Sequence, residues 1–206
     1  VAVTVRCVAV RSLAKVMDSA DPDAASTACT WLEDIDARVR RAAMDALDQL
    51  ASRGDERAIS SLIARLQDED VVVRCMAVRL LARVVNHSDG RIIEVLSAQL
   101  EQQDDGVRHT VIDALTKVTE RGDERAIAAV SARMHHNDPS VRGTAVLALT
   151  RVAHRGDSRA VRAVIDHLQH PELAQDSRAL CGAIAELAKV AEHGDEAAFQ
   201  RRLMEK

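Results

Sequence analysis

Apolar residues recur along this chain in one pattern that returns every 34 residues. Each copy carries a Val-Arg pair, with apolar side chains one residue before its Arg and 3, 4, 7, 10 and 11 residues after it. These positions trace one face of an α-helix, and strand spacing does not fit them. Although Val1 to Val5 alternates like a strand, its register with the later copies predicts a helix there too. The five pairs are Val5-Arg6, Val39-Arg40, Val73-Arg74, Val107-Arg108 and Val141-Arg142.

Start and stop signals divide each copy into two helices. In four of the five copies an aspartate four residues before the Arg is placed to cap a first helix, and Pro139 takes the favoured first helical position in one copy. These helices are expected to stop near Gly54, Gly122 and Gly156. The next aspartate then caps a second helix, with apolar residues 3, 4, 7, 8 and 11 positions further on. The two sets of capping residues are Asp36, Asp70, Asp104 and Asp138, and Asp55, Asp89, Asp123 and Asp157.

Two antiparallel helices per unit, repeated about six times in 206 residues, predict an all-α protein. Neither helix buries its apolar stripe without neighbouring units, so we expect one right-handed α-α superhelix of about twelve helices over residues 1–206. The units should begin near residues 3, 37, 71, 105, 139 and 177. Four extra residues between Leu168 and Asp176 make the last unit atypical, and 171–206 is expected to form a C-terminal cap. Because the chain starts inside a repeat, we expect it to be a piece of a longer protein.

The repeated motif is Asp-x-x-Val-Arg-x-x-Ala-x-x-x-Leu followed by Gly-Asp-x-Arg-Ala-Ile, as in Asp36 to Leu47 and Gly54 to Ile59. The tetratricopeptide repeat has the same period, but its pattern needs Trp, Gly-Tyr, Phe and Pro in each unit, and this chain has one Trp, one Phe, no Tyr and three Pro. The motif resembles the short HEAT-like repeats named after the phycobilisome lyases. That resemblance implies a HEAT-like solenoid with an Asp–Arg ladder between repeats.

Composition narrows the classes of function. The formal net charge of −4, from 28 Lys and Arg against 32 Asp and Glu, gives no electrostatic basis for general nucleic-acid or anionic-membrane binding. The sequence shows no apolar run of transmembrane length and no signal peptide, which favours a soluble, cytoplasmic protein. The cysteines form no CxxC pair, so we expect free thiols rather than a zinc site or disulfides. They are Cys7, Cys29, Cys75 and Cys181.

Several motifs that carry chemistry elsewhere have structural interpretations here. Arg-Gly-Asp occurs three times, each time where Gly makes a turn and Asp caps the next helix. Four histidines near the ends of two second helices, His135, His136, His167 and His170, lack an HExxH arrangement and are expected to be surface residues. The sequence shows no Gly-rich phosphate loop, nucleophile elbow or paired catalytic carboxylates. It therefore predicts a non-catalytic protein with no cofactor and no metal.

Two rows of arginines follow the repeat. The Arg of each Val-Arg pair lies within the apolar arc, where a guanidinium needs carboxylate or carbonyl partners to offset desolvation. In the second row, surface pairing with carboxylates such as Glu56 and Glu124 is favoured over a phosphate-binding rail. This row consists of Arg57, Arg91, Arg125 and Arg159.

Stacked repeats usually present a surface to a partner, so we expect a protein-interaction scaffold. The resemblance implies that the Val-Arg helix lines the concave side, and its outward positions are 1, 5, 9 and 12 residues after the Arg. At the fifth position the charge alternates in sign, so either neighbouring units pair these charges or a partner of mixed charge does. The expected partner is a protein or peptide, not nucleic acid or a membrane. The candidate partner-binding residues are Arg11, Asp45, Arg79, Arg83, His109, Asp113, Lys117 and Arg151.

Two further expectations concern ligands and assembly. The resemblance keeps open an alternative role as a bilin lyase subunit, although a tetrapyrrole pocket would want aromatic walls that the repeats lack. We also expect self-association through the N-terminal edge, because inner units cover the same apolar stripe with a preceding helix. That stripe consists of Val3, Val5, Ala9, Val10, Leu13 and Val16.

Overall fold

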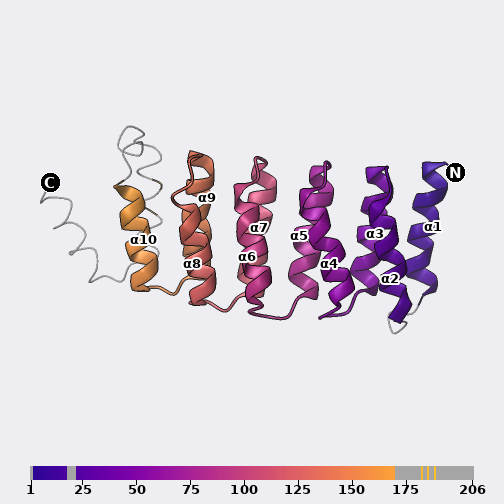
Figure 1. Ribbon diagram of the computed structural model, residues 1–206, viewed down its shortest axis with the longest axis horizontal. Helices are drawn as coiled ribbons and strands as arrows, with labels where there is room; N and C mark the ends of the chain where they lie inside the picture. Colours follow the sequence, from indigo (N-terminus) through magenta and orange to yellow (C-terminus); the bar gives the residue numbers. More distant parts are fainter. Residues whose placement is uncertain (1, 18–21, 170–181, 183–184, 186–187, 189–206) are drawn as a thin grey trace, which may run out of the picture.

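The computed structural model describes residues 2–17, 22–169, 182, 185 and 188 of the chain. Within these ranges it contains ten α-helices and no β-strand, which confirms the all-α prediction. The helices stand side by side in a line from one end of the chain to the other (Figure 1). The predicted sixth unit and the cap at 171–206 fall almost entirely outside the described residues.

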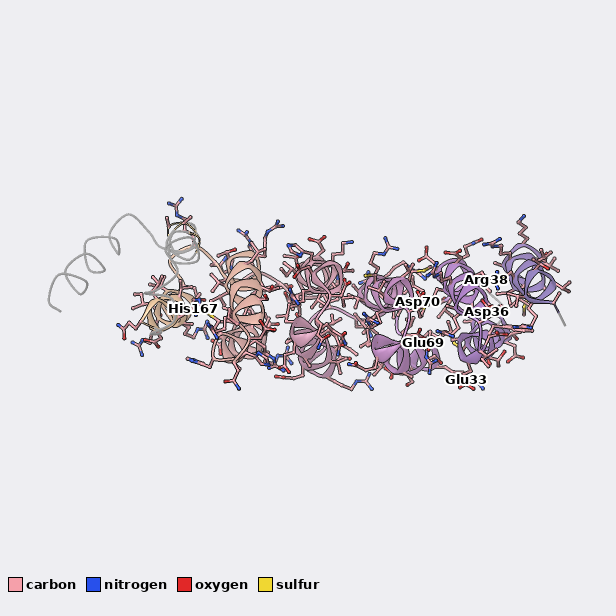
Figure 2. The ribbon with its side chains drawn as sticks, turned by 90° about the horizontal axis from the view of Figure 1, so that it is seen from above. Glu33, Asp36, Arg38, Glu69, Asp70 and His167 are labelled. Carbon is pink, nitrogen blue, oxygen red and sulfur yellow. The ribbon has the colours of Figure 1, made fainter. Side chains whose placement is uncertain are left out.

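Seen from above, the helices form two rows (Figure 2). The first row holds the helices that carry the Val-Arg pairs: α1 (Val3–Val16), α3 (Ala37–Leu50), α5 (Val71–Val84), α7 (Asp105–Val118) and α9 (Pro139–Val152). The second row holds α2 (Pro22–Thr30), α4 (Glu56–Ala64), α6 (Gly90–Ala98), α8 (Glu124–Arg133) and α10 (Ser158–Leu168). Three of the second helices continue into a 3₁₀ turn, at Trp31–Glu33, Arg65–Gln67 and Gln99–Glu101. Consecutive first helices contact one another, so each unit rests on the next.

The repeated apolar positions fill the core between the two rows. Val73 and Leu81 on α5 are completely buried, as are Ala58 and Leu62 on α4. Their equivalents recur in neighbouring units, so the core continues along the array rather than closing within one unit. The stripe of each helix is therefore buried by adjacent units, as the periodicity predicts.

Both sets of capping aspartates take their predicted role. Asp36 accepts a hydrogen bond from the backbone N–H of Arg38 at 2.9 Å, at the start of α3. Asp55 accepts from Arg57 and Ala58 at 3.0 Å each, at the start of α4. Such a bond satisfies backbone donors that have no partner inside the helix. The same interaction begins the later helices at Asp70, Asp89, Asp104, Asp123, Asp138 and Asp157.

The first helices end several residues before the glycines, so the predicted helix ends were wrong by that number of residues. Helix α3 ends at Leu50, because Ala51 already has an extended backbone. Gly54 lies further on, with a φ of +82°, and its N–H donates to the carbonyl of Val84 at the end of α5 at 2.6 Å. The last carbonyls of a helix lack an intrahelical donor, so this left-handed turn ties each unit to the next. The same bond joins Ser88 to Val118 and Gly122 to Val152, each at 2.7 Å.

Candidate partner-binding surface

The outward side chains of the first helices form one row of exposed charges across the array. The structure places all eight candidate residues on the surface, on α1, α3, α5, α7 and α9. At the fifth position after each Arg, the row reads Arg11, Asp45, Arg79 and Asp113. Among the described residues, none of these four side chains has a hydrogen-bond or ion-pair partner. Neighbouring units therefore do not pair this alternating series, which remains open to solvent.

Two of the eight candidate residues are engaged within the fold. Arg83 forms an ion pair with Asp48 of the preceding unit at 2.8 Å and donates to the carbonyls of Leu47 and Ala51 at 3.3 and 3.2 Å. His109 places Nδ1 2.8 Å from the carbonyl of Asp105 in its own helix. Asp48 is not among the predicted candidates; it stands eight residues after Arg40 and contacts the next unit through Arg83. Arg83 therefore contributes to the contact between α3 and α5.

A groove of about 380 Å³ lies in this row between α1 and α3. Arg11 and Lys15 line it from α1, and Asp45 and Asp48 line it from α3. Its other lining residues include two alanines with short side chains, Ala14 and Ala46. The groove therefore offers cations on one wall and carboxylates on the other.

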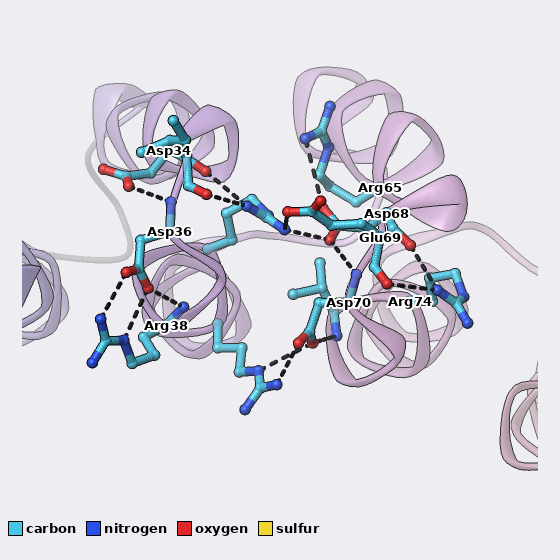
Figure 3. A network of polar contacts seen from close by, with 12 residues as sticks. Asp34, Asp36, Arg38, Arg65, Asp68, Glu69, Asp70 and Arg74 are labelled. Atoms are coloured by element: carbon cyan, nitrogen blue, oxygen red, sulfur yellow. Dashed lines mark hydrogen bonds and ion pairs between the residues drawn. The ribbon is translucent and has the colours of Figure 1, made fainter.

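A separate network of arginines and aspartates lies where each second helix turns into the next first helix (Figure 3). Arg6 on α1 binds both carboxylate oxygens of Asp34, in the turn before α3, at 2.8 and 2.9 Å. Arg40 on α3 donates to one carboxylate oxygen of Asp68, in the turn before α5, at 2.6 Å, and the side chains of this pair are only 5% and 2% exposed. Each ion pair ties a first helix to the turn that leads into the next unit.

The comparisons with known proteins agree with this architecture. The sequence profile described as HEAT repeats matches residues 3–82, 59–150 and 93–185, and so covers most of the chain. The chain belongs to the HEAT repeat family. No match among curated proteins was found.

Solved structures show the same fold as this HEAT array. Two engineered proteins from the Northeast Structural Genomics Consortium are 22% and 21% identical to it, with TM-scores of 0.52 and 0.55. The first alignment covers 91% of this chain and 92% of that protein, and the second covers 92% and 93%. At this level of identity the likeness concerns the fold alone. The finer resemblance to the phycobilisome-lyase type of repeat is not established by these matches.

The Asp–Arg ladder that the resemblance implies is interrupted along this HEAT array. The position that Asp34 and Asp68 occupy is taken by Gln102 and then by His136 in the following units. Arg74 accordingly donates to the carbonyls of Asp68 and Glu69, at 2.7 and 3.3 Å, and the structure shows no ladder carboxylate for it (Figure 3). The Asp–Arg pairs of the ladder are therefore present at Arg6 and Arg40 and do not continue in the later units that the structure describes.

A different contact is common to the later arginines of the ladder. Arg40, Arg74, Arg108 and Arg142 each donate to the two carbonyls found six and five residues earlier in the chain. Arg108 also donates to the hydroxyl of Thr144 at 3.2 Å and pairs with Asp105. The contact that recurs in these units is therefore between the arginine and the backbone carbonyls of the turn before its own helix. An aspartate partner in the turn before the next unit is present for Arg6 and Arg40. Carbonyl oxygens supply the acceptors that a buried guanidinium needs.

In the second arginine row, the predicted pairing with a carboxylate of a neighbouring unit is confirmed for Arg91 and Arg159. Arg91 contacts Glu56 at 3.1 Å, and Arg159 contacts Glu124 at 2.8 Å. Arg125 instead donates to the carbonyl of Ser88 at 2.8 Å. The difference follows from the sequence, because Gly90 occupies the position that Glu56 and Glu124 occupy in their units. All these arginines are exposed, so each pair contributes little to stability.

The histidines differ from the prediction of four surface residues. His167 on α10 is only 3% exposed, so the surface interpretation is wrong for it (Figure 2). It projects from the apolar side of its helix, in line with Ala160 and Val164. His135 is exposed, and Nδ1 of the half-buried His136 accepts the backbone N–H of Asp138 at 3.0 Å. His170 lies outside the described residues.

The described residues contain no group of three or more His, Cys, Asp or Glu side chains placed to bind a metal ion. None of the described helices combines the length and the apolar character needed to cross a membrane. Cys7, Cys29 and Cys75 are free thiols, and Cys181 falls outside the described part.

Acid should destabilise the array through its arginine-bound aspartates. The side-chain hydrogen bond from Arg38 lowers the pKa of Asp36 to about 2. Arginine hydrogen bonds also lower the pKa values of Asp34 and Asp70. An unfolded aspartate titrates near pH ~4, so these groups stabilise the fold above that pH, and the contribution is lost as the pH falls. We expect urea unfolding to show a free energy that drops between about pH 4 and about pH 2.

The partner of Asp70 offers a specific check on this prediction. Arg41 binds the Asp70 carboxylate at 3.1 and 2.5 Å. In the Arg41→Gln variant, the pKa of Asp70 moves toward its unfolded value, so the loss of stability in acid should be less steep. An equally steep loss in the variant would contradict the assignment.

Proposed function

We propose that this HEAT array is a non-catalytic scaffold that binds a protein or peptide segment along the exposed row of its first helices, the predicted concave side. One observation carries the proposal. The alternating charges at Arg11, Asp45, Arg79 and Asp113 have no partner among the described residues, whereas charges elsewhere, such as Arg83, Arg91 and Arg159, form ion pairs with a neighbouring unit. Ordered but unpaired charges of both signs are suited to a partner of mixed charge.

The same row argues against nucleic acid as the partner. A phosphate backbone is uniformly negative, so it meets Asp45 and Asp113 in every second unit. The net charge of −4 adds a general repulsion. Aromatic anchors are rare, since the chain has one Trp and one Phe, so arginine is the residue type most able to supply binding energy. The bilin-lyase alternative gains no support from the family match, which is to HEAT repeats in general.

The test uses peptides selected on the chain itself from a displayed library of random peptides. Reversing Arg79 and Lys117 to Glu should weaken the selected peptides about tenfold, since two attractions become repulsions. Circular dichroism and the melting temperature should change little, because both side chains are exposed. The measurement is the dissociation constant by fluorescence anisotropy.

A matched control separates this surface from a general effect of charge. Arg53 and Arg57 are also exposed, and reversing both to Glu changes the net charge by the same amount away from the row. Peptide binding should survive this control. Binding that ignores the reversal of Arg79 and Lys117, or tight binding of DNA or RNA at physiological salt, would refute the proposal.

The proposal extends to self-association through the N-terminal edge. Val5 and Val16 on α1 are 56% and 83% exposed, whereas their equivalents Val73 and Val84 on α5 are fully buried. Val10 is buried against the rest of the array, so the predicted stripe is only partly uncovered. The exposed part has the residue types of an interface between units, and a second copy of the chain is suited to cover it. Self-association makes the stability of a protein depend on its concentration, which allows a test.

A further inference from the structure

The exposed row is regular enough to specify the charge pattern of its ligand. We propose that the row reads an extended peptide in which acidic and basic side chains alternate at every third residue. This inference rests on the proposed function and deepens it. The evidence is the sign, the spacing and the surroundings of four unpaired side chains.

The sign of each position follows from the sequence and its openness from the structure. The row offers a cation on α1, a carboxylate on α3, a cation on α5 and a carboxylate on α7, namely Arg11, Asp45, Arg79 and Asp113. None of the four has a partner in the described part of the chain. The series ends at α9, where the equivalent residue is the half-buried Leu147. A complementary ligand therefore carries four alternating charges.

The spacing of the ligand follows from the packing of the helices. Neighbouring packed helices have axes roughly 10 Å apart. A peptide in the extended polyproline II conformation has three residues per turn and advances about 3.1 Å per residue, so every third side chain lies on the same face, about 9 Å further along. This distance is close to one helix spacing, so Glu or Lys side chains three residues apart can all face the row. The resulting pattern is acid-x-x-base-x-x-acid-x-x-base.

The groove between α1 and α3 supplies the anchor of this ligand. In the next interface the ion pair of Asp48 with Arg83 bridges α3 and α5. The equivalent positions one unit earlier are Ala14 and Gln49, which cannot form such a pair. The space that the bridge would occupy is the groove of about 380 Å³, with Arg11 and Lys15 on one wall and Asp45 on the other. One acidic side chain of the peptide faces Arg11 in this groove, and the basic side chain three residues further on faces Asp45.

The experiment measures a fluorescent ten-residue peptide in which Glu and Lys alternate at every third residue, with Ser and Thr between them. This peptide should bind about tenfold more tightly than three controls of the same length. The controls carry only Glu at the four anchor positions, only Lys at those positions, or alternating Glu and Lys at every second residue. Each control keeps some attractions but loses the match of sign or of spacing.

A switch in which peptide is preferred tests the register, meaning the match between the charges of the row and those of the peptide. This test does not rely on loss of binding. In the Asp45→Lys variant the first three positions of the row are all cationic, and the side chain is exposed, so the fold is unaffected. This variant should gain affinity for the all-Glu peptide about tenfold and lose it for the alternating peptide. A gain of binding cannot result from misfolding.

The outcomes separate this inference from the proposed function. If the library peptides depend on Arg79 and Lys117 but the alternating peptide is not preferred, the register is wrong and the scaffold function stands. An unchanged ranking of peptides in the Asp45→Lys variant also overturns the register. If no peptide depends on the row, both proposals fail.

Discussion

The Asp68→Ala variant should lose about 3 kcal/mol of unfolding free energy, because it removes the buried counter-charge of Arg40 and leaves only the exposed carboxylate of Glu69, at 3.1 Å. The side chains of Arg40 and Asp68 are 5% and 2% exposed and lie 2.6 Å apart. Asp68 also accepts the backbone N–H of Asp70 at 3.0 Å, so the substitution removes a second hydrogen bond. Urea unfolding at neutral pH, followed by circular dichroism, measures the loss.

Two controls define what the Asp68 result means. Asp48→Ala removes an ion pair with Arg83 whose side chains are 54% and 41% exposed, and it should cost less than about 1 kcal/mol. Replacing both Arg40 and Asp68 by apolar residues of similar size should recover most of the stability, since no buried charge remains. A loss in Asp68→Ala no larger than that in Asp48→Ala would show that this pair is not buried in solution.

The second large effect is expected for Val84→Ala, and the equivalent position in another unit, Val16, provides its control. Val84→Ala should cost about 2 kcal/mol, because it removes two fully buried methyl groups between units. Val16 occupies the equivalent position on α1 but is 83% exposed. Val16→Ala should therefore be nearly neutral in dilute protein. The pair isolates burial, since residue type, helix position and substitution are identical.

Protein concentration then tests the N-terminal edge. If a second copy covers this edge, Val16→Ala should become destabilising as the concentration rises, while the cost of Val84→Ala stays constant. Sedimentation equilibrium should show association that is weaker in the Val16 variant. A cost for Val16→Ala that does not change over the range in which the parent chain associates would exclude this edge from the contact.

The exposed row shows which properties of a surface a repeat pattern predicts and which it does not. Once the helical face was known, the position of Arg79 or Asp113 within the unit was enough to place it on the surface. The pairing of Arg83 with Asp48 was not visible in the same way, because the two residues lie in different units, 35 positions apart. Only the structure could therefore show which charged side chains of the row have no partner among the described residues.

The Asp–Arg ladder likewise could be predicted only in part from the sequence. The sequence contains Gln102 and His136 where Asp34 and Asp68 stand in earlier units. Those substitutions have meaning only once the structure shows that each arginine reaches a residue 28 positions later. The constant contact, donation from the arginine to the carbonyls of its own turn, involves backbone atoms and leaves no trace in residue type. The burial of His167 likewise depends on the packing around α10.

The sequence by itself determined the helices, their capping residues and the face that each one buries, because these depend on interactions within one or two turns of chain. The tertiary structure alone decided how the units are joined. It set the bond from Gly54 to the carbonyl of Val84, the groove beside Asp45, and the aspartates that Arg6 and Arg40 reach in the turn before the next unit. These features depend on the stacking of residues about one repeat apart in the chain, and stacking places side chains and carbonyls together in a way that periodicity does not encode.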